Sequence, residues 1–514
     1  MSNRQLQAAC LFLAVFAVLI TPMVLVRLDT WALRTGLSCL YVVVVLPLSV
    51  ETMEILLAFA WNEPVTCELE QPPARRKTAV LMAVRDDWNL TAVASLRSLV
   101  SAGYDAFILD DSRVPCPLPL RDCTSLQRIT RPSAIGAKAG NLNHWLRSFA
   151  NKYEYAILLD SDSVMPVETA DRLVLAADHP KNCDVALFQA KIRAAACCSP
   201  LARALGTLAK PRMRILSRVH SQLGWLLSFG HNQLVRLSAI RSIGDFDEAF
   251  TCEDTVLSLE LARENWGIRI LNAWSEDTEP EEFFQYRRRY LRWARQTLEL
   301  FGGNWNEVPI GLKIVLCRHL FSYVSPIASM ALFLLSIWSW PWPFRETKEF
   351  MSCALQLLPG YEIVGELTWL GIGFLGFFFV LRFVMSKLEG IPLRAQLRAA
   401  PFLGIPNALL IIPIGRALLT SMTTTPVQFI PTGDKHRHND LGPFASLLEA
   451  TASSVVILSL AAGVLVHPAS LLVGLNAIWL AMILFSVAAR LILWVVESRR
   501  PGPVPPAPAT QDLE

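Results

Sequence analysis

Apolar residues gather near the two ends of this 514-residue chain, and that uneven distribution constrains its fold more than any other feature. The composition is 53% hydrophobic and only 18% charged, which argues against an ordinary soluble protein. A membrane-spanning helix needs about 20 predominantly apolar residues. Six candidate spans are Leu6–Val26, Leu37–Ala60, Val315–Trp338, Leu367–Met385, Ala445–Val466 and Leu471–Val495. The sequence therefore predicts membrane helices on both sides of a globular middle.

A seventh apolar stretch, Pro401 to Leu419, contains three prolines and Arg416, which disfavour a membrane span. Basic residues lie on both sides of it, so we expect an interfacial or re-entrant segment. Glu51 and Glu54 interrupt the second run, and we expect them to line the bundle interior. No small-residue cleavage site follows the first run, which indicates an uncleaved anchor.

Charge and cysteine content exclude several classes of protein. The net charge of +3 is too small to indicate binding of nucleic acid. The 11 cysteines include no CxxC pair, so a disulfide framework or a structural zinc site is improbable.

The middle of the chain, from about Lys77 to Asn306, alternates short apolar stretches with helical patterns, which is typical of an α/β domain with a parallel sheet. The predicted strands are Ala79–Val84, Ala106–Leu109, Tyr155–Leu159 and Ala186–Gln189. The predicted helices are Leu90–Ser101, Asn141–Ala150 and Thr255–Glu264. Ligands of such sheets bind at the carboxyl ends of the strands.

These patterns predict a cytosolic α/β domain inserted between transmembrane helices. The predicted units are two transmembrane helices in 1–62, the α/β domain in 77–306, two transmembrane helices in 311–390, an interfacial segment and possible gating loop in 391–442, two transmembrane helices in 443–496 and a disordered cytosolic tail in 497–514. Six spans place both termini in the cytosol.

Acidic residues follow three of the predicted strands. Asp160 and Asp162 are separated by one residue after a buried strand, a spacing that suits Mg²⁺ or Mn²⁺ shared with a diphosphate. Asp110 and Asp111 also stand at a strand end. Asp87 could accept hydrogen bonds from a base or ribose, although Asp residues at turns commonly cap helices instead.

Two further blocks could complete a site. Lys138 lies in a glycine-bearing turn that enters a helix, where it could contact phosphate or be a solvated lysine. Glu253 and Asp254 open the next helix, where they could be ordinary caps. In the functional interpretation Asp254 is a general base that takes a proton from a hydroxyl.

The segment Gln285–Gln296 carries five arginines and one tryptophan. Arg292 could bind a diphosphate through its planar donors, and Trp293 could present an apolar face to a sugar. An amphipathic helix on anionic lipid headgroups is the alternative, and different arginines could serve both roles.

Together these blocks resemble the family 2 membrane glycosyltransferases, which include the cellulose and hyaluronan synthases. Lys138–Asn143 matches the KAGNLN motif in full, and Asp160–Asp162, Glu253–Asp254 and Arg292–Trp293 match its DxD, TED and QxxRW motifs. Gly230-His231-Asn232 is similar to the GHN of the bacterial periplasmic-glucan glucosyltransferases. The stretch from Phe429 to Lys435 is similar to the gating loop of cellulose synthases.

The resemblance implies a GT-A-like catalytic domain with a mixed, mostly parallel sheet, a UDP-sugar donor and Mg²⁺ or Mn²⁺ as cofactor. The implied roles are uridine binding by Asp87 with Asp110 or Asp111, diphosphate contacts by Lys138, Asp160 and Arg292, metal binding by Asp160 and Asp162, catalysis by Asp254 with Glu253, and acceptor binding by Trp293, Gly230, His231 and Asn232.

Four segments depart from the family pattern. Cys252 replaces the threonine of TED, and the gating loop has Gly433-Asp434-Lys435 instead of the usual spacing. Arg85-Asp86-Asp87 replaces the usual Tyr-Asn-Glu, and Arg289 replaces the glutamine of QxxRW, as in ceramide glucosyltransferases, which glycosylate a lipid once.

The resemblance therefore implies an inverting hexosyltransferase of the bacterial inner membrane, which moves glucose from UDP-glucose to a β-glucan and could export it. One alternative is a single transfer to a lipid such as diacylglycerol or ceramide. Another is a catalytically silent membrane scaffold. The expected partners are the donor, a glycan or lipid acceptor and the bilayer.

Overall fold

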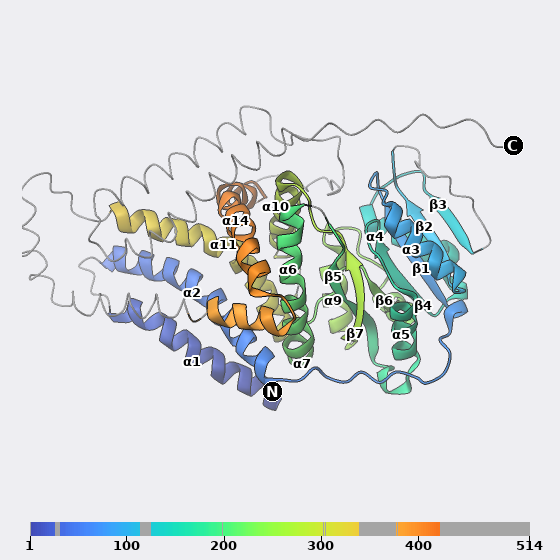
Figure 1. The fold of residues 1–514 in the computed structure, drawn as a ribbon, viewed down its shortest axis with the longest axis horizontal. Helices are drawn as coiled ribbons and strands as arrows, with labels where there is room; N and C mark the ends of the chain where they lie inside the picture. The colour runs from blue at the N-terminus through green and yellow to red at the C-terminus, as the bar shows by residue number, and fades with distance from the viewer. Residues whose placement is uncertain are drawn as a thin grey trace, which may run out of the picture.

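The computed structural model describes residues 2–25, 31–113, 125–197, 199–301, 303, 305–338, 377 and 379–421. The predicted spans Ala445–Val466 and Leu471–Val495, the gating loop and the C-terminal tail lie outside the described residues, as does about half of Leu367–Met385. Figure 1 shows an α/β domain beside a set of long helices.

One seven-stranded sheet forms the centre of the α/β domain, in the order β3-β2-β1-β4-β6-β5-β7. Its strands are β1 Thr78–Val84, β2 Asp105–Asp110, β3 Leu126–Thr130, β4 Tyr155–Asp160, β5 Val185–Ala194, β6 Gln233–Arg236 and β7 Gly267–Asp277. Strand β6 runs antiparallel to β4 and β5, and the other pairings are parallel. The predicted mixed, mostly parallel sheet is confirmed.

The register of the sheet brings the acidic strand ends together. Val84 pairs with Asp110 across β1 and β2, and Ala83 pairs with Asp160 across β1 and β4. The three parallel strands therefore end at one edge of the sheet, where their following turns meet.

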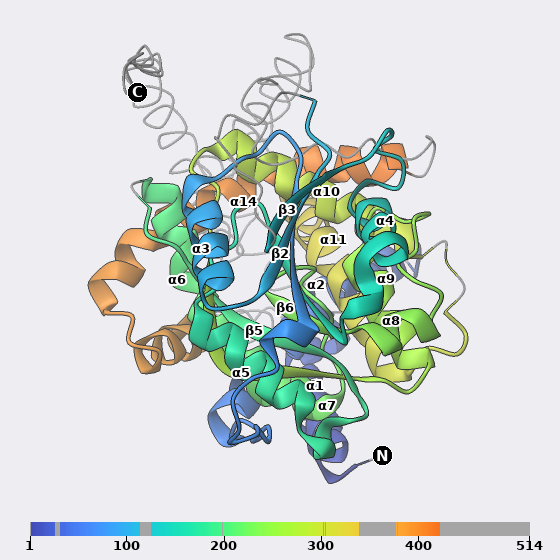
Figure 2. The ribbon, with the colours of Figure 1, turned by 90° about the vertical axis from the view of Figure 1, so that its right-hand side faces the viewer.

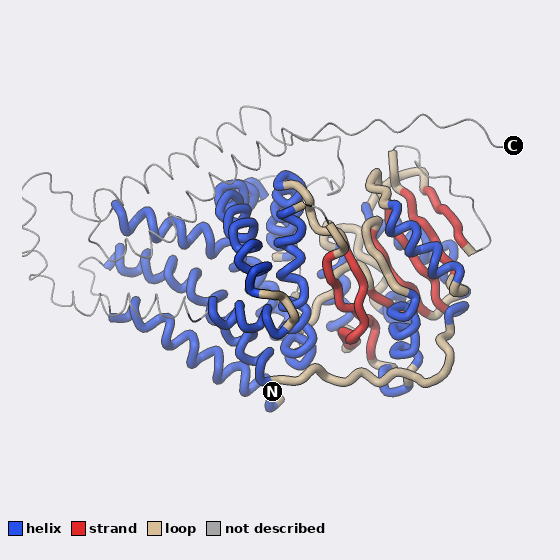
Figure 3. Tube along the Cα trace, viewed as in Figure 1, coloured by secondary structure: helices blue, strands red, loops and turns tan. Residues whose placement is uncertain are grey.

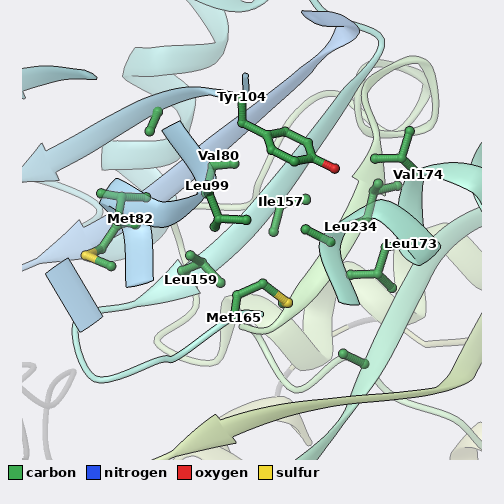
Figure 4. Packing of buried hydrophobic residues seen from close by; sticks show 14 of the residues in the cluster. Val80, Met82, Leu99, Tyr104, Ile157, Leu159, Met165, Leu173, Val174 and Leu234 are labelled. Carbon is green, nitrogen blue, oxygen red and sulfur yellow. The ribbon is translucent and has the colours of Figure 1, made fainter. Parts of the chain in front are cut away.

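Helices cover both faces of the sheet because its central strands are apolar on both sides. They are α3 Leu90–Ser101, α4 Ala137–Phe149, α5 Val167–Asp178, α8 Leu237–Ser242 and α9 Glu253–Arg263. Val80, Met82 and Ile157 pack against α3 and α5, whereas Leu81 and Leu158 pack against α4, α8 and α9. Figure 2 shows the two groups of helices on opposite sides, and Figure 4 shows the packing on the α3 face.

Three described helices are long and apolar enough to cross a membrane, which supports the prediction of a membrane protein. They are α1 Asn3–Leu25, α2 Trp31–Ala60 and α11 Ile310–Trp338. As expected, Glu54 is fully buried, and it pairs with Arg318 of α11 at 2.6 Å and with His220 at 2.8 Å. Glu51 is partly exposed and pairs with Arg382.

Three more helices lie between the sheet and this bundle in the views of Figures 1 and 3. They are α6 Pro200–Ile215, α10 Phe283–Leu300 and α14 Leu393–Ser421, and the short helix α7 Ser221–Leu223 lies at the base of α6. Helix α14 contains the whole stretch from Pro401 to Leu419, so its prolines do not end the helix. It packs on α6 and α10, and it is not among the candidate spans of the described residues.

The β4 strand supports the acidic edge, so its core packing should be sensitive to truncation. We expect Ile157→Ala to lower the free energy of unfolding by about 2–5 kcal/mol, because the fully buried side chain leaves a cavity. Thermal unfolding of the purified protein in nanodiscs measures the effect. Val65→Ala, at a 90% exposed position, is the control, and equal unfolding temperatures for the two variants would contradict the packing described here.

Candidate functional site

Lys138 is the point at which several predicted site residues meet. It lies in the first turn of α4, and its Nζ forms an ion pair with Asp160 at the end of β4. The same Nζ donates to the carbonyl oxygen of Gly230 at 3.0 Å and lies 3.8 Å from Glu253 Oε1 at the start of α9. Four segments that are distant in the sequence are therefore joined by one ammonium group.

The opposite charges around Lys138 keep one another ionised. Burial alone would lower the pKa of Lys138, but Asp160, Glu253 and Asp254 raise it above its usual range. Burial would raise the pKa of Asp160, but Lys138 and His231 bring it below its usual range. Both groups of the pair are therefore ionised near neutral pH.

Glu253 and Asp254 occupy the first turn of α9 beside Lys138. Burial raises the pKa of Glu253 to about 7, with a further contribution from the charge of Asp254. Burial also raises the pKa of Asp254, whose Oδ1 accepts from the N–H of Thr255 at 2.7 Å. A carboxylate with a raised pKa is suited to accept a proton near neutral pH.

A second group of acids lies next to Asp160. Burial, together with the charges of Asp277 and Asp160, raises the pKa of Asp162 to about 7. The pKa of Asp277, at the end of β7, is raised to about 7 by burial and by Asp160. Thr278 Oγ1 donates to Asp162 Oδ2 at 2.7 Å, and His231 Nε2 lies 3.7 Å from Asp277 Oδ2.

Sequence reasoning missed Asp277 because β7 was not predicted. The signal was the mostly apolar stretch from Ile268 to Trp274, which Ser275 separates from Glu276-Asp277, an arrangement similar to the acidic end of β4.

The carboxylates fit a divalent cation that is shared with a ligand. Among the described residues, no three His, Cys, Asp or Glu side chains are placed to hold a metal ion by themselves. Magnesium is commonly bound by one or two carboxylates together with substrate phosphates. Burial and the charges of Asp277 and Asp160 raise the pKa of Asp162, and a cation next to Asp160 and Asp162 would offset those charges.

Helix α10 brings Arg292 and Trp293 to this region. Burial lowers the pKa of Arg292, and the charges of Asp160, Glu253 and Asp254 oppose that effect, so the guanidinium interacts electrostatically with these acids. The Arg289 guanidinium lies over the Trp293 ring at 5.4 Å and forms an ion pair with Glu279. Arg289, which stands at the position of the family glutamine, therefore makes a cation–π contact with Trp293.

Asp110 and Asp111 already have cationic partners. Arg128 Nε donates to Asp110 Oδ2 at 2.7 Å, and Arg131 donates to both oxygens of Asp111 at 2.8 and 2.6 Å. The side chains of Asp110 and Asp111 are 1% and 5% exposed. Both acids brace the turns around the site, and their binding of uridine stays a prediction.

Asp87 lies beside the turn that follows β4. Its Oδ1 accepts from the N–H of Arg85 at 2.8 Å, and the Ser161 side chain contributes a further hydrogen bond. Burial raises the pKa of Asp87 to about 6. An acid in this position can accept hydrogen bonds from a ligand, as predicted for a base or ribose.

The structure separates the roles within the KAGNLN segment. A Cβ at Gly140 would clash with the carbonyl oxygen of Ile135. Asn141 Nδ2 donates to the Leu109 carbonyl at 3.0 Å, and Asn143 makes hydrogen bonds with both backbone groups of Phe246. Glycine and the asparagines therefore lock α4 in place, and Lys138 alone of these residues reaches the acidic group.

The predicted acceptor residues Gly230, His231 and Asn232 stand next to the same acids. His231 lies between Asp277 and Ser163, whose Oγ is 3.4 Å from His231 Nδ1. Asn232 is fully buried at φ +54°, and its carbonyl accepts from Ala190 N at 3.0 Å. The acceptor role of all three stays a prediction.

The raised pKa of Asp87 predicts a pH-dependent stability. Its carboxyl titrates near pH 6 in the folded chain and near pH 4 when unfolded, so the folded state holds more protons between these values. Stability is therefore lost as the pH rises from about 4 to about 6. We expect Asp87→Asn to gain unfolding temperature relative to the wild type across that interval.

Thermal unfolding from pH 4 to 8 measures this difference. Asp184→Asn, at an exposed position, is the control for removal of one charge. A difference between Asp87→Asn and the wild type that stays constant over the whole range would contradict the assignment.

Comparison with known proteins supports the resemblance. Residues 155–384 match the family model described as glycosyl transferase family group 2. Glucans biosynthesis glucosyltransferase H of Caulobacter vibrioides is 24% identical over 288 residues, which cover 48% of this chain and 40% of that protein. The protein of the same name from Pectobacterium carotovorum is 26% identical over 281 residues, which cover 47% of this chain and 31% of that protein.

The chain thus spans less than half the length of these curated relatives. A solved mannosyltransferase from Pyrobaculum calidifontis, in complex with GDP-Man and Mn²⁺, has a TM-score of 0.41 and 15% identity, and the alignment covers 68% of this chain and 98% of that one. The resemblance that the motifs predict is confirmed by the family-model match over residues 155–384, and long apolar helices flank the α/β domain.

Proposed function

We propose that this chain is a membrane-embedded, inverting glycosyltransferase that moves glucose from UDP-glucose to a growing β-glucan. The observation that carries the proposal is the convergence of Lys138, Asp160, Asp254 and Arg292 from α4, β4, α9 and α10 on one buried, charge-compensated group. The names of the relatives from Caulobacter and Pectobacterium support glucose and glucan as donor sugar and product.

In the proposed reaction the cations bind the donor and Asp254 activates the acceptor. Lys138 and Arg292 are cations that can bind the two phosphates of the donor. Asp254 takes the proton of the acceptor hydroxyl as its oxygen attacks the anomeric carbon. The bond from that carbon to the phosphate oxygen breaks on the opposite face, so UDP leaves and the configuration inverts.

Asp162 with Asp160 would hold Mg²⁺ or Mn²⁺ in this proposal. The bound cation supplies neutralisation of the negative charge that develops on the departing diphosphate. Asp87 would contact the nucleoside, because it lies beside the same turn.

The proposed acceptor site is next to Trp293. The Arg289 guanidinium lies over the Trp293 ring, and the ring centroids of Trp293 and Tyr290 are 5.5 Å apart. The Trp293 ring offers an apolar face to a sugar ring. We place the domain at the cytosolic face of a bacterial inner membrane, with the flanking helices as a route for export.

A donor and product assay tests this function. Purified protein in nanodiscs is incubated with labelled UDP-glucose and Mg²⁺ or Mn²⁺, and the products are separated by solvent extraction and by linkage analysis. We expect label in a water-soluble β-linked glucan. Label only in organic-extractable glycolipid would replace the polymer with a lipid acceptor, and no transfer from any sugar nucleotide would favour a scaffold.

The base assignment predicts a large effect of one conservative change. Asp254→Asn keeps the shape of the side chain but cannot take a proton, so we expect transfer to fall by about 10²–10⁴-fold. Glu264→Gln, at an exposed position just after the end of the same helix α9, is the matched control. Initial rates of UDP release measure both variants, and an Asp254→Asn rate near that of the control would remove the assignment.

Removal of divalent cations should abolish transfer, because in this proposal the carboxylates of Asp160 and Asp162 hold the cation and the donor phosphates complete the metal shell. Dialysis against EDTA followed by titration with Mn²⁺ measures the requirement. We expect Asp162→Asn to need a higher Mn²⁺ concentration for half-maximal activity, whereas full activity of the wild type in EDTA would contradict the metal proposal.

A further inference from the structure

Gly230 lies between Lys138, which binds the donor in the proposed function, and Asp254, which takes the proton of the acceptor. It precedes β6 with φ +81°, in the left-handed region that favours glycine. Its carbonyl oxygen accepts from Lys138 Nζ at 3.0 Å, and its N–H donates to Ser228 Oγ at 3.0 Å. The backbone of Gly230 therefore has a fixed orientation.

The other side of Gly230 faces Asp254. A Cβ added to Gly230 would lie 3.2 Å from Asp254 Cβ, 3.4 Å from its Oδ2 and 3.6 Å from its Cγ. The first of these separations is closer than an ordinary van der Waals contact, so a side chain at Gly230 would push on the whole side chain of Asp254. The Oδ1 of Asp254 is held by Thr255, so Oδ2 is the oxygen that Gly230 borders.

A second link ties the same loop to α9. Ser228 N donates to Ser258 Oγ at 2.7 Å, and Ser258 Oγ donates to the carbonyl oxygen of Asp254 at 2.9 Å. Ser228, Ser258 and the Asp254 backbone are buried or partly buried. The loop is thus linked to the backbone of Asp254 through Ser258, and it lies against the Asp254 side chain at Gly230.

We propose that Gly230 is a positioning residue that sets the separation between Lys138 and Asp254. Its carbonyl oxygen accepts from Lys138, and its Cα, which carries no side chain, lies against Asp254. This inference rests on the proposed function and assigns Gly230 a role other than acceptor contact. Because a misplacement of about 1 Å in a reacting group can cost ~10²-fold in rate, the absence of a side chain here has a kinetic consequence.

The test compares two left-handed glycines. Gly230→Ala should lower kcat by about 10- to 100-fold, with the KM for UDP-glucose changed less than about threefold, because the carbonyl that holds Lys138 is retained. Gly244→Ala is the matched control: Gly244 has φ +83°, and an added Cβ would meet no atom within 4 Å. It carries the same backbone strain without a neighbour, so its kcat should stay near the wild-type value.

The outcomes separate the two proposals. Equal kcat values for Gly230→Ala and Gly244→Ala, with an active wild type, would overturn the positioning role and leave the proposed function standing. A wild type that transfers no glucose would overturn both. If Gly230→Ala does not yield folded protein, Ser228→Ala takes its place, since it removes the acceptor of the Gly230 N–H without adding an atom. A wild-type kcat for that variant would likewise overturn the inference.

Discussion

The ion pair between Lys138 and Asp160 is the interaction on which the arrangement of the site depends. A buried ammonium without a partner would lose its proton, and a buried carboxylate without one would gain a proton. Each group keeps the other charged, and the ammonium also contacts the Gly230 carbonyl and approaches Glu253. The end of β4, the start of α4, the loop before β6 and the start of α9 thereby share one centre. A ligand that binds near Lys138 is consequently close to Asp254.

Around that ion pair, further contacts hold these four segments in place. The parallel pairing of β1 with β2 and β4 brings the acidic ends to one edge. Asn141 and Asn143 tie α4 to β2 and to the Phe246 loop, so Lys138 cannot move without its helix. Gln296 of α10 donates to the Thr251 carbonyl at 2.6 Å, which links the arginine-rich helix to the loop before α9. Helices α6, α10 and α14 lie between this domain and the long apolar helices.

Much of this fold could be predicted from the sequence, because β1, β2 and β4 are apolar runs that end in acids and α3 has an asparagine cap. Strand β6 has only four residues, and Arg269 and Asn272 interrupt the apolar residues of β7. Both patterns were therefore weaker than those of β1, β2 and β4, and Asp277 was missed with β7. The partners of Asp110 and Asp111 could not be predicted either. Arg128 and Arg131 lie 18 and 20 residues away, and only folding brings those charges together. The same limit applied to the KAGNLN segment, where spacing alone does not show which side chain faces the site.

We propose that the acids and cations around Lys138 form a site for a nucleoside diphosphate and a divalent cation. Isothermal titration of the nanodisc-embedded protein with UDP, with and without Mn²⁺, measures this binding. We expect binding that requires Mn²⁺ and is weakened at least tenfold by Lys138→Ala, but not by Lys152→Ala at an exposed position. Binding of UDP that is indifferent to Mn²⁺ and equal in the two variants would contradict this proposal.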